Sequence, residues 1–474
     1  MPARRIGLVV GLLLFVATII LPPPAGMPRE AWTVAGLVMW MATWWMTEAI
    51  PLTATALLPF LVLPFGGILN AKETASAYYD PILFLILGGA FIALAIERTG
   101  LHRKLSLAIL RTIGRGGSHG EMRLLLAFMT SAAVLSMFIS NTSTALIMMP
   151  MAIAVLAGGG SADHEREGLA GALPIGIAFA ASIGGLGTII GSPTNGIAVA
   201  LIDELTGTRI SFLEWMAYGL PTVVIGIPLA AFFIARVQRI ADHPFDVRGA
   251  REAIDDHLPL TGPQKRLLPI IGVAFALWAT QLFVAPLMPP GSWTDGTIAI
   301  AAGILLFLIP DGTGRPLLTW SEADRAPWGV IMMFGGGLAL AAGMGASGLA
   351  DWLGQALLPL SVFPLVAIAL AMVALVIVVT EFASNVATAS AIMPVVASLC
   401  VALGVDPVLL AMPVALAASW GFMLPAGTGP NAIAWSTGRI LLPRMIKSGV
   451  LLDVAGPLII VGSVWGAAAL LGYG

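Results

Sequence analysis

The sequence predicts an all-α polytopic membrane protein built from two related halves, and three observations lead to this fold class. Of the 474 residues, 58% are hydrophobic and 10% are charged, whereas soluble domains carry about 25% charged residues. Apolar runs long enough to cross a bilayer recur along the whole chain. Two of the longest runs are interrupted by polar motifs that match each other. A surface with so few charges requires lipid as its solvent, so the lipid bilayer is an expected partner.

Charge, cysteine and histidine content exclude several other classes of protein. The net charge of −2 offers no basic face for nucleic acid, and Cys400, the single cysteine, can form neither an intrachain disulfide nor a cysteine metal cluster. The five histidines lie in polar connecting stretches without metal-ligand spacing. The apolar run 6–21 follows Arg4 and Arg5 as in a signal peptide, but it ends in three prolines without a clear cleavage pattern. We interpret it as a retained first transmembrane helix.

Each further span is assigned from a run of about 20 apolar residues. Six spans are expected in the first half, near 6–22, 30–47, 51–66, 80–98, 169–204 and 214–237. Five are expected in the second half, near 266–287, 293–310, 328–345, 407–438 and 448–471. The polar region 238–264 predicts a cytoplasmic linker, which divides the chain into a first repeat, 1–237, and a second repeat, 265–474.

The interrupted stretches 122–157 and 363–402 decide the topology. If each crossed the membrane once, basic residues would lie on both sides. If each is a re-entrant hairpin, about 11 transmembrane helices remain. With a cytoplasmic N-terminus, outward loops then hold only Arg29, Lys72 and Arg209 of the 23 Lys and Arg residues. This agrees with the positive-inside rule and favours the hairpins.

The two interruptions align beyond their shared Ser-Asn pair. Asn141 aligns with Asn385, and the same register also pairs Thr144 with Thr388, Met149 with Met393 and Pro150 with Pro394. A second match joins 191–198 to 427–434, and weaker ones pair Gly88-Gly89 with Gly336-Gly337 and Gly100-Leu101 with Gly348-Leu349. An odd number of crossings separates the halves, so we expect inverted repeats with broken helices, as in many secondary transporters.

The polar motifs predict a binding site between the halves. Polar groups at membrane depth are costly unless they have partners or line a cavity. The hairpin tips and the loops 191–195 and 427–431 together offer hydroxyl, amide and carbonyl oxygens, which suit Na⁺, and helix N-termini, which suit an anion. The alternative is that Ser, Asn and Thr merely hold helices together. Two motifs in register, each followed by its own loop, favour the binding site.

Glu381 lies one helical turn before Asn385 and invites two interpretations. It either carries a proton or cation, or it braces the hairpin through hydrogen bonds. The matching position in the first half is Met137, which favours the brace. We find no histidine and no paired carboxylates within the spans, so a membrane-embedded enzyme is a remote alternative and the protein is not expected to be an enzyme.

With its paired Ser-Asn tips, its Thr47–Pro51 segment and its Thr380–Asn385 segment, the chain resembles the divalent anion/sodium symporter family over nearly its whole length. That family includes Na⁺/dicarboxylate, citrate and sulfate cotransporters. The resemblance implies a homodimer in which each protomer has a scaffold domain and a transport domain that moves as an elevator. It also implies a bacterial inner-membrane location.

The resemblance implies two sodium sites and a substrate site, residue by residue. The first sodium site would comprise Ser136, Ser140, Asn141 and Gly191, and the second Thr380, Ala383, Asn385 and Gly427. The substrate would meet Asn141, Thr142, Ser192, Pro193, Asn385, Val386, Thr428 and Gly429.

Two of these positions depart from the family pattern. Position 386 is Val where the family has Thr, and position 429 is Gly where Pro or a small residue is frequent. The expected function is Na⁺-coupled uptake of a di- or tricarboxylate of the succinate, malate or citrate type. A sulfate transporter and a proton-coupled or exchange carboxylate transporter are the alternatives. No basic residue lies near either tip, which favours coupling to Na⁺.

Overall fold

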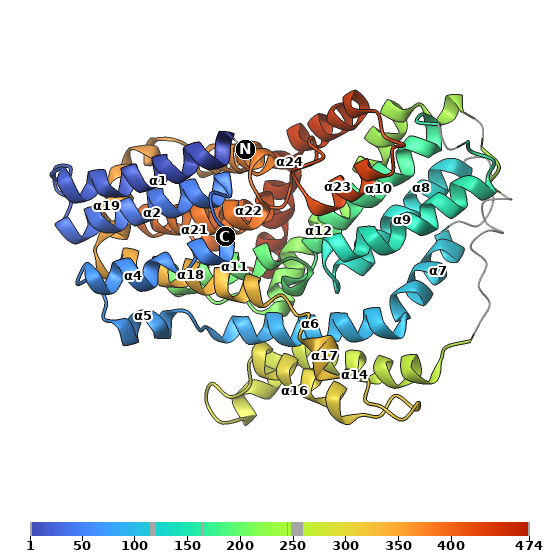
Figure 1. Ribbon diagram of the computed structural model, residues 1–474, viewed down its shortest axis with the longest axis horizontal. Helices are drawn as coiled ribbons and strands as arrows, with labels where there is room; N and C mark the ends of the chain where they lie inside the picture. Colours follow the sequence, from blue (N-terminus) through green and yellow to red (C-terminus); the bar gives the residue numbers. More distant parts are fainter. Residues whose placement is uncertain (1, 114–119, 163–164, 244, 248–258, 473–474) are drawn as a thin grey trace.

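The computed structural model describes residues 2–113, 120–162, 165–243, 245–247 and 259–472. Over these residues the chain folds into helices without a β-sheet, which confirms the predicted all-α class. Figure 1 shows two groups of helices side by side, with one long helix, α6 (Pro81–Thr99), running past both of them.

Nine helices of the described residues are long and apolar enough to cross a membrane, by length and composition. They are α1 (Pro2–Ile20), α6, α9 (Asn141–Gly158), α10 (Gly168–Gly185), α12 (Phe212–Gln238), α18 (Trp328–Ala346), α20 (Leu365–Phe382), α21 (Asn385–Leu403) and α24 (Leu442–Leu471). Shorter apolar helices are α3 (Leu52–Thr55) with α4 (Leu58–Phe65), α16 (Asp295–Leu308) and α22 (Pro407–Ala417). The protein is therefore an integral membrane protein, and the number of crossings stays a prediction.

The remaining α-helices of the described residues are shorter or less apolar. They are α2 (Arg29–Thr47), α5 (Ala71–Ala77), α7 (Leu101–Ile113), α8 (Gly120–Ser136), α11 (Pro193–Thr206), α14 (Gly262–Ala279), α15 (Gln281–Val284), α17 (Trp320–Ala323), α19 (Leu349–Leu357) and α23 (Gly429–Ser436). One group in Figure 1 contains α1, α2, α4, α5, α18 and α19, and it encloses a smaller hydrophobic core of its own. The other contains α8, α9, α10, α12, α23 and α24, while α14 and α16 pack along α6.

Both predicted hairpins are broken where the sequence indicates. The side chain of Ser140 caps α9 by accepting a hydrogen bond from Ser143 N at 3.1 Å. Ser384 caps α21 in the same way, accepting from Ala387 N at 3.2 Å. Serine satisfies an unpaired N–H at a helix start, so the Ser-Asn motif begins a new helix in each stretch. The two arms of each stretch pack against each other.

The spans predicted at 169–204 and 407–438 are each divided into two helices. Residues 186–192 separate α10 from α11, and residues 418–428 separate α22 from α23.

The weaker glycine match between the two halves also has a structural counterpart. Gly100 joins α6 to α7 with φ +70°, and Gly348 joins α18 to α19 with φ +76°, a backbone region that L side chains rarely adopt.

The boundaries differ from the prediction at both ends of the second half. Helix α24 begins at Leu442 rather than near 448, because its first turns carry Arg444 and Lys447 and so lack the apolar signal. The predicted span 266–287 is helical from Gly262 to Ala279 and then continues in short turns. Within the predicted linker 238–264, residues 244 and 248–258 lie outside the described residues.

Candidate functional site

The first cluster of oxygens forms where the tip of the first hairpin meets the loop 186–192. The Asn141 amide lies 2.7 Å from Ser136 Oγ. When its NH₂ group faces the loop, it lies 3.2 Å from both the Gly191 and the Ala181 carbonyl oxygens. Gly185 makes room for this amide, since a Cβ at that position would lie 2.4 Å from Asn141 Oδ1. Three of the four residues predicted for the first sodium site therefore lie together.

Hydrogen bonds hold the loop 186–192 in place. Thr188 Oγ1 donates to the Met137 carbonyl at 2.5 Å and accepts from Gly191 N at 3.0 Å. Asn195 Nδ2 donates to the carbonyl oxygens of Gly185, at 2.7 Å, and Thr188, at 2.8 Å. The loop is thus tied both to the break in the hairpin and to the start of α11.

The second cluster repeats this arrangement at the tip of the second hairpin. Thr380 Oγ1 lies 2.9 Å from Asn385 Oδ1 and 2.7 Å from the Ala418 carbonyl oxygen. Asn431 Nδ2 donates to the Leu424 carbonyl at 3.1 Å, as Asn195 does to Thr188 in the first half. Matched contacts in both halves indicate that each tip and its loop form one structural unit.

Glu381 is where the two clusters differ. Its carboxylate accepts hydrogen bonds from Met423 N, at 2.9 Å, and Leu424 N, at 3.1 Å. These N–H groups belong to the loop 418–428, which also contains Gly427. Glu381 therefore holds the loop of the second cluster in place. In the first cluster, the hydroxyl of Thr188 holds the loop 186–192 instead.

The two halves meet through Thr142 and Gly429. A Cβ at position 429 would lie 2.4 Å from Thr142 Oγ1, so the start of α23 approaches the first tip closely. Helix α9 packs on α23, and α11 packs on α21. Each hairpin thus contacts a helix that follows the loop of the opposite half, and four helices (α9, α11, α21 and α23) begin at residues predicted for the site.

Both clusters fit Na⁺ by the chemistry of their donors. Hydroxyl, amide and carbonyl oxygens are hard ligands, and broken membrane helices offer them to Na⁺. Several buried oxygens of the described residues lack a hydrogen-bond partner. Four of them belong to the helices and loops that build the two clusters, Ser182 Oγ and Asn195 Oδ1 in the first half, and Ser419 Oγ and Asn431 Oδ1 in the second. Such oxygens have lone pairs that a cation would satisfy.

Other predicted site residues have different surroundings. The Ser140 hydroxyl is engaged with Ser143, both as the cap of α9 and as a donor to Ser143 Oγ at 3.0 Å. Ala383 ends α20 in an extended conformation. Val386 packs against both hydrophobic cores. Thr428 accepts from Asn431 N at 3.3 Å and so caps α23.

A cavity of about 200 Å³ lies beside the first tip. Ser140, Ser192 and Pro193 line one part of it, and Glu97 and Arg325 line another. The cavity therefore connects hydroxyl groups of the predicted site with one acidic and one basic side chain.

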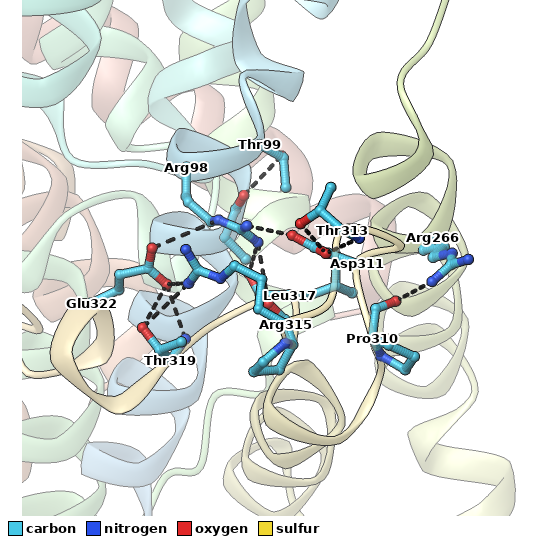
Figure 2. A network of polar contacts seen from close by, with 12 residues as sticks. Arg98, Thr99, Arg266, Pro310, Asp311, Thr313, Arg315, Leu317, Thr319 and Glu322 are labelled. Carbon is cyan, nitrogen blue, oxygen red and sulfur yellow. Dashed lines mark hydrogen bonds and ion pairs between the residues drawn. The ribbon is translucent and has the colours of Figure 1, made fainter.

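A polar network fixes the end of α6 next to this cavity (Figure 2). Arg98 forms an ion pair with the buried Asp311 and donates to the Leu317 carbonyl at 2.7 Å. Arg315 binds Glu322 at 2.6 Å in the same network. Hydrogen bonds from Thr313 and Arg98 hold the pKa of Asp311 well below its usual range. This network anchors the helical turn that also carries Glu97.

Four participants were not predicted from the sequence. The carbonyl of Ala181 belongs to the apolar helix α10, and that of Ala418 directly follows the apolar helix α22. An alanine in such a run gives no signal that its backbone is a ligand. Glu97 and Arg325 lie far apart in sequence, near helix ends where charges are ordinary. The signal that would find them is spatial, because only the fold brings them to one cavity.

The chain is similar to known transporters along its whole length. The family model for the sodium:sulfate symporter transmembrane region matches residues 3–471. The sodium-dependent dicarboxylate transporter SdcS of Staphylococcus saprophyticus is 39% identical over 478 residues, which cover 97% of this chain and 90% of that protein. The SdcS protein of Staphylococcus aureus strain NCTC 8325 is 38% identical over 471 residues, with the same coverage.

A solved structure shows a similar fold. The crystal structure of the YdaH transporter of Alcanivorax borkumensis matches with a TM-score of 0.58 and covers 94% of this chain and 99% of that chain. Its sequence identity is 15%, so this likeness shows the fold alone. The family match and the two relatives confirm the resemblance inferred from the paired tips, and the chain belongs to the sodium:sulfate symporter family.

Proposed function

We propose that this protein is a secondary active transporter that uses an inward Na⁺ gradient to take up a di- or tricarboxylate of the succinate, malate or citrate type. The observation that carries this proposal is the pair of matched oxygen clusters, joined across the halves by Thr142 and Gly429. Relatives at 38–39% identity are named sodium-dependent dicarboxylate transporters, which supports both the ion and the substrate class.

The arrangement of these residues supports separate binding places for Na⁺ and for the carboxylate substrate. Na⁺ would bind the oxygens of Ser136, Asn141 and Gly191 in the first cluster, and those of Thr380, Asn385 and Ala418 in the second. The substrate would bind near the starts of α9 and α23, because helix N-termini carry partial positive charge and attract carboxylates. Bound Na⁺ would add positive charge beside this anion and order the loops that contact it.

Several features of the transport cycle belong to the same proposal. We propose inverted repeats at 1–237 and 265–474, an elevator movement of a transport domain against a scaffold domain, a homodimer, and a cytoplasmic N-terminus in a bacterial inner membrane. The matched hydrogen bonds in the two halves and the separate smaller core around α1, α2 and α18 support this division.

The test is uptake of labelled succinate into proteoliposomes under an inward Na⁺ gradient. Uptake should stop when K⁺ replaces Na⁺, and succinate, malate and citrate should be compared as competitors. Asn141→Ala and Asn385→Ala should each abolish uptake, whereas Ser436→Ala, at the end of α23, should leave it unchanged. Equal uptake in K⁺ would contradict coupling to Na⁺. Competition by sulfate but not by any carboxylate would assign the site to sulfate instead.

A further inference from the structure

The chain crosses the base of the first hairpin directly after α12. The base is the end opposite the tip, where α8 begins, α9 ends and the next helix, α10, begins. These three helices pack against one another (Figure 1). His243, Phe245 and Val247 lie against their ends, and we call these three residues the strap.

Phe245 is the central strap residue and joins both arms of the hairpin. Its backbone N–H donates to Glu121 Oε1, in the first turn of α8, at 3.3 Å. Its ring lies over Gly159, the residue that follows α9, because a Cβ there would lie 2.1 Å from Phe245 Cζ. The ring is half-buried and packs against the larger hydrophobic core. Phe245 therefore contacts the start of one arm and the end of the other.

The two outer strap residues contact α10 and α8. His243 Nε2 lies 3.1 Å from an oxygen of Glu167, the residue that precedes α10. A Cβ at Gly168, the first residue of α10, would lie 2.6 Å from His243 Cβ. A Cβ at Gly120, the first residue of α8, would lie 3.0 Å from Val247 Cγ2. Glycine at these helix ends lets the strap approach them closely.

The helices whose ends meet the strap are the helices that carry the first oxygen cluster. Ser136 is the last residue of α8, Asn141 is the first residue of α9, and Ala181 belongs to α10. Each helix has 17 or 18 residues, so the strap and the cluster are about 20–25 Å apart. A packed helix carries a displacement from one end to the other as a rigid element. Holding the three ends at the base therefore fixes where the oxygens of the first cluster lie.

We infer that the strap positions the first sodium site from the far end of the helices that carry it, with Phe245 as the central positioning residue. The inference rests on the proposed function, which assigns the first oxygen cluster to Na⁺. The second cluster lies on α20 and the loop 418–428, whereas the strap contacts α8, α10 and the end of α9. The effect of the strap is therefore confined to the first site.

The test is a double-mutant cycle between Phe245 and Gly159. Phe245→Ala removes the ring that joins the two arms, and Gly159→Ala places a methyl group where that ring lies. Each should raise the half-saturating Na⁺ concentration for succinate uptake several-fold. In the double variant the methyl group meets no ring, so the rise should be close to that of Phe245→Ala alone. Phe232→Ala, which removes an exposed ring from α12, is the matched control and should change nothing.

Two further readouts distinguish positioning from a general loss of stability. At saturating Na⁺ the KM for succinate should return to the wild-type value in both single variants, because bound Na⁺ holds the first cluster together. Stabilisation of the purified protein by Na⁺ against heat needs no substrate. Its half-saturating Na⁺ concentration should rise by the same factor as that for uptake.

The inference is wrong if Phe245→Ala and Gly159→Ala keep the wild-type response to Na⁺, or if their effects add in the double variant. It is also wrong if the KM for succinate rises equally at every Na⁺ concentration. A wild-type protein that neither takes up succinate with Na⁺ nor gains stability from Na⁺ would overturn the proposed function instead. If Phe245→Ala fails to fold, Phe245→Leu takes its place in the cycle, because it keeps an apolar side chain but removes the ring.

Discussion

Thr142 and Gly429 occupy neighbouring space, because a Cβ at position 429 would lie 2.4 Å from Thr142 Oγ1. Thr142 belongs to the tip of the first hairpin and Gly429 begins a helix of the second half. The missing side chain at 429 therefore lets the threonine hydroxyl approach the loop of the opposite half. In the proposed substrate site, this contact would shape one side, and an apolar residue, Val386, would lie at the other tip.

Gly429→Ala should push the Thr142 side chain out of its position. We expect the KM for succinate to rise several-fold with little change in the half-saturating Na⁺ concentration, because neither oxygen cluster includes position 429. Concentration-dependent uptake measures both values. Thr142→Ala removes the side chain that a Cβ at position 429 would meet. Adding Gly429→Ala to that variant should therefore raise the KM for succinate by a smaller factor than Gly429→Ala does alone. Additive effects would show that the contact does not shape the site.

Val386→Thr should add the hydroxyl that the family pattern contains. A hydrogen bond to a charged group contributes about 1.5–3 kcal/mol, so the KM for a dicarboxylate should fall about tenfold or more. Uptake with succinate and sulfate as competitors measures the change and its selectivity. Val386→Ala removes apolar contact without adding a hydroxyl and is the control. A fall in KM for both variants would mean that space, not hydrogen bonding, limits affinity.

Arg325→Gln should reduce the electrostatic attraction of the anionic substrate to the cavity beside the first tip. We expect a several-fold rise in KM at low ionic strength that shrinks as salt is added, because salt screens exposed charges. Arg325→Lys should behave almost as wild type. Arg209→Gln removes another exposed basic side chain, which pairs with Asp203, and serves as the control. An effect that is independent of salt would contradict an electrostatic role.

Asp311→Asn should lower the thermal stability of the purified protein at neutral pH, because it leaves Arg98 without its buried partner. The folded-state pKa of Asp311 lies below its ordinary value, so the ionised group stabilises the fold at higher pH. That stabilisation is present above an unfolded-state pKa of about 3.9 and is lost as pH falls toward the folded-state value. The difference in Tm should therefore be constant between about pH 5 and 8 and shrink in stronger acid. Asp203→Asn, in a largely exposed pair, should have little effect.

The sequence predicts most of this architecture because its strongest signals are local. Ser140 and Ser384 begin helices since serine caps an N-terminus, and that preference needs no tertiary contact. The broken spans follow from Gly, Pro and Asn within apolar runs. The residues that could not be predicted act through long-range contact. The Ala418 carbonyl reaches Thr380 only after separate helices have packed. The same is true of Asp453 on α24, which interacts with Glu381 on α20, so the expectation of no paired carboxylates within the spans is wrong.

The crossed packing of the two halves has a consequence for biosynthesis. Thr142 leaves the ribosome about 290 residues before Gly429, which at roughly 5–20 residues per second is a delay of about 15–60 s. During that interval the first hairpin is made but the helix on which it packs does not yet exist. The nascent N-terminal half must therefore wait in the bilayer with a polar tip still unpartnered. Its last native contacts can form only when translation is nearly complete.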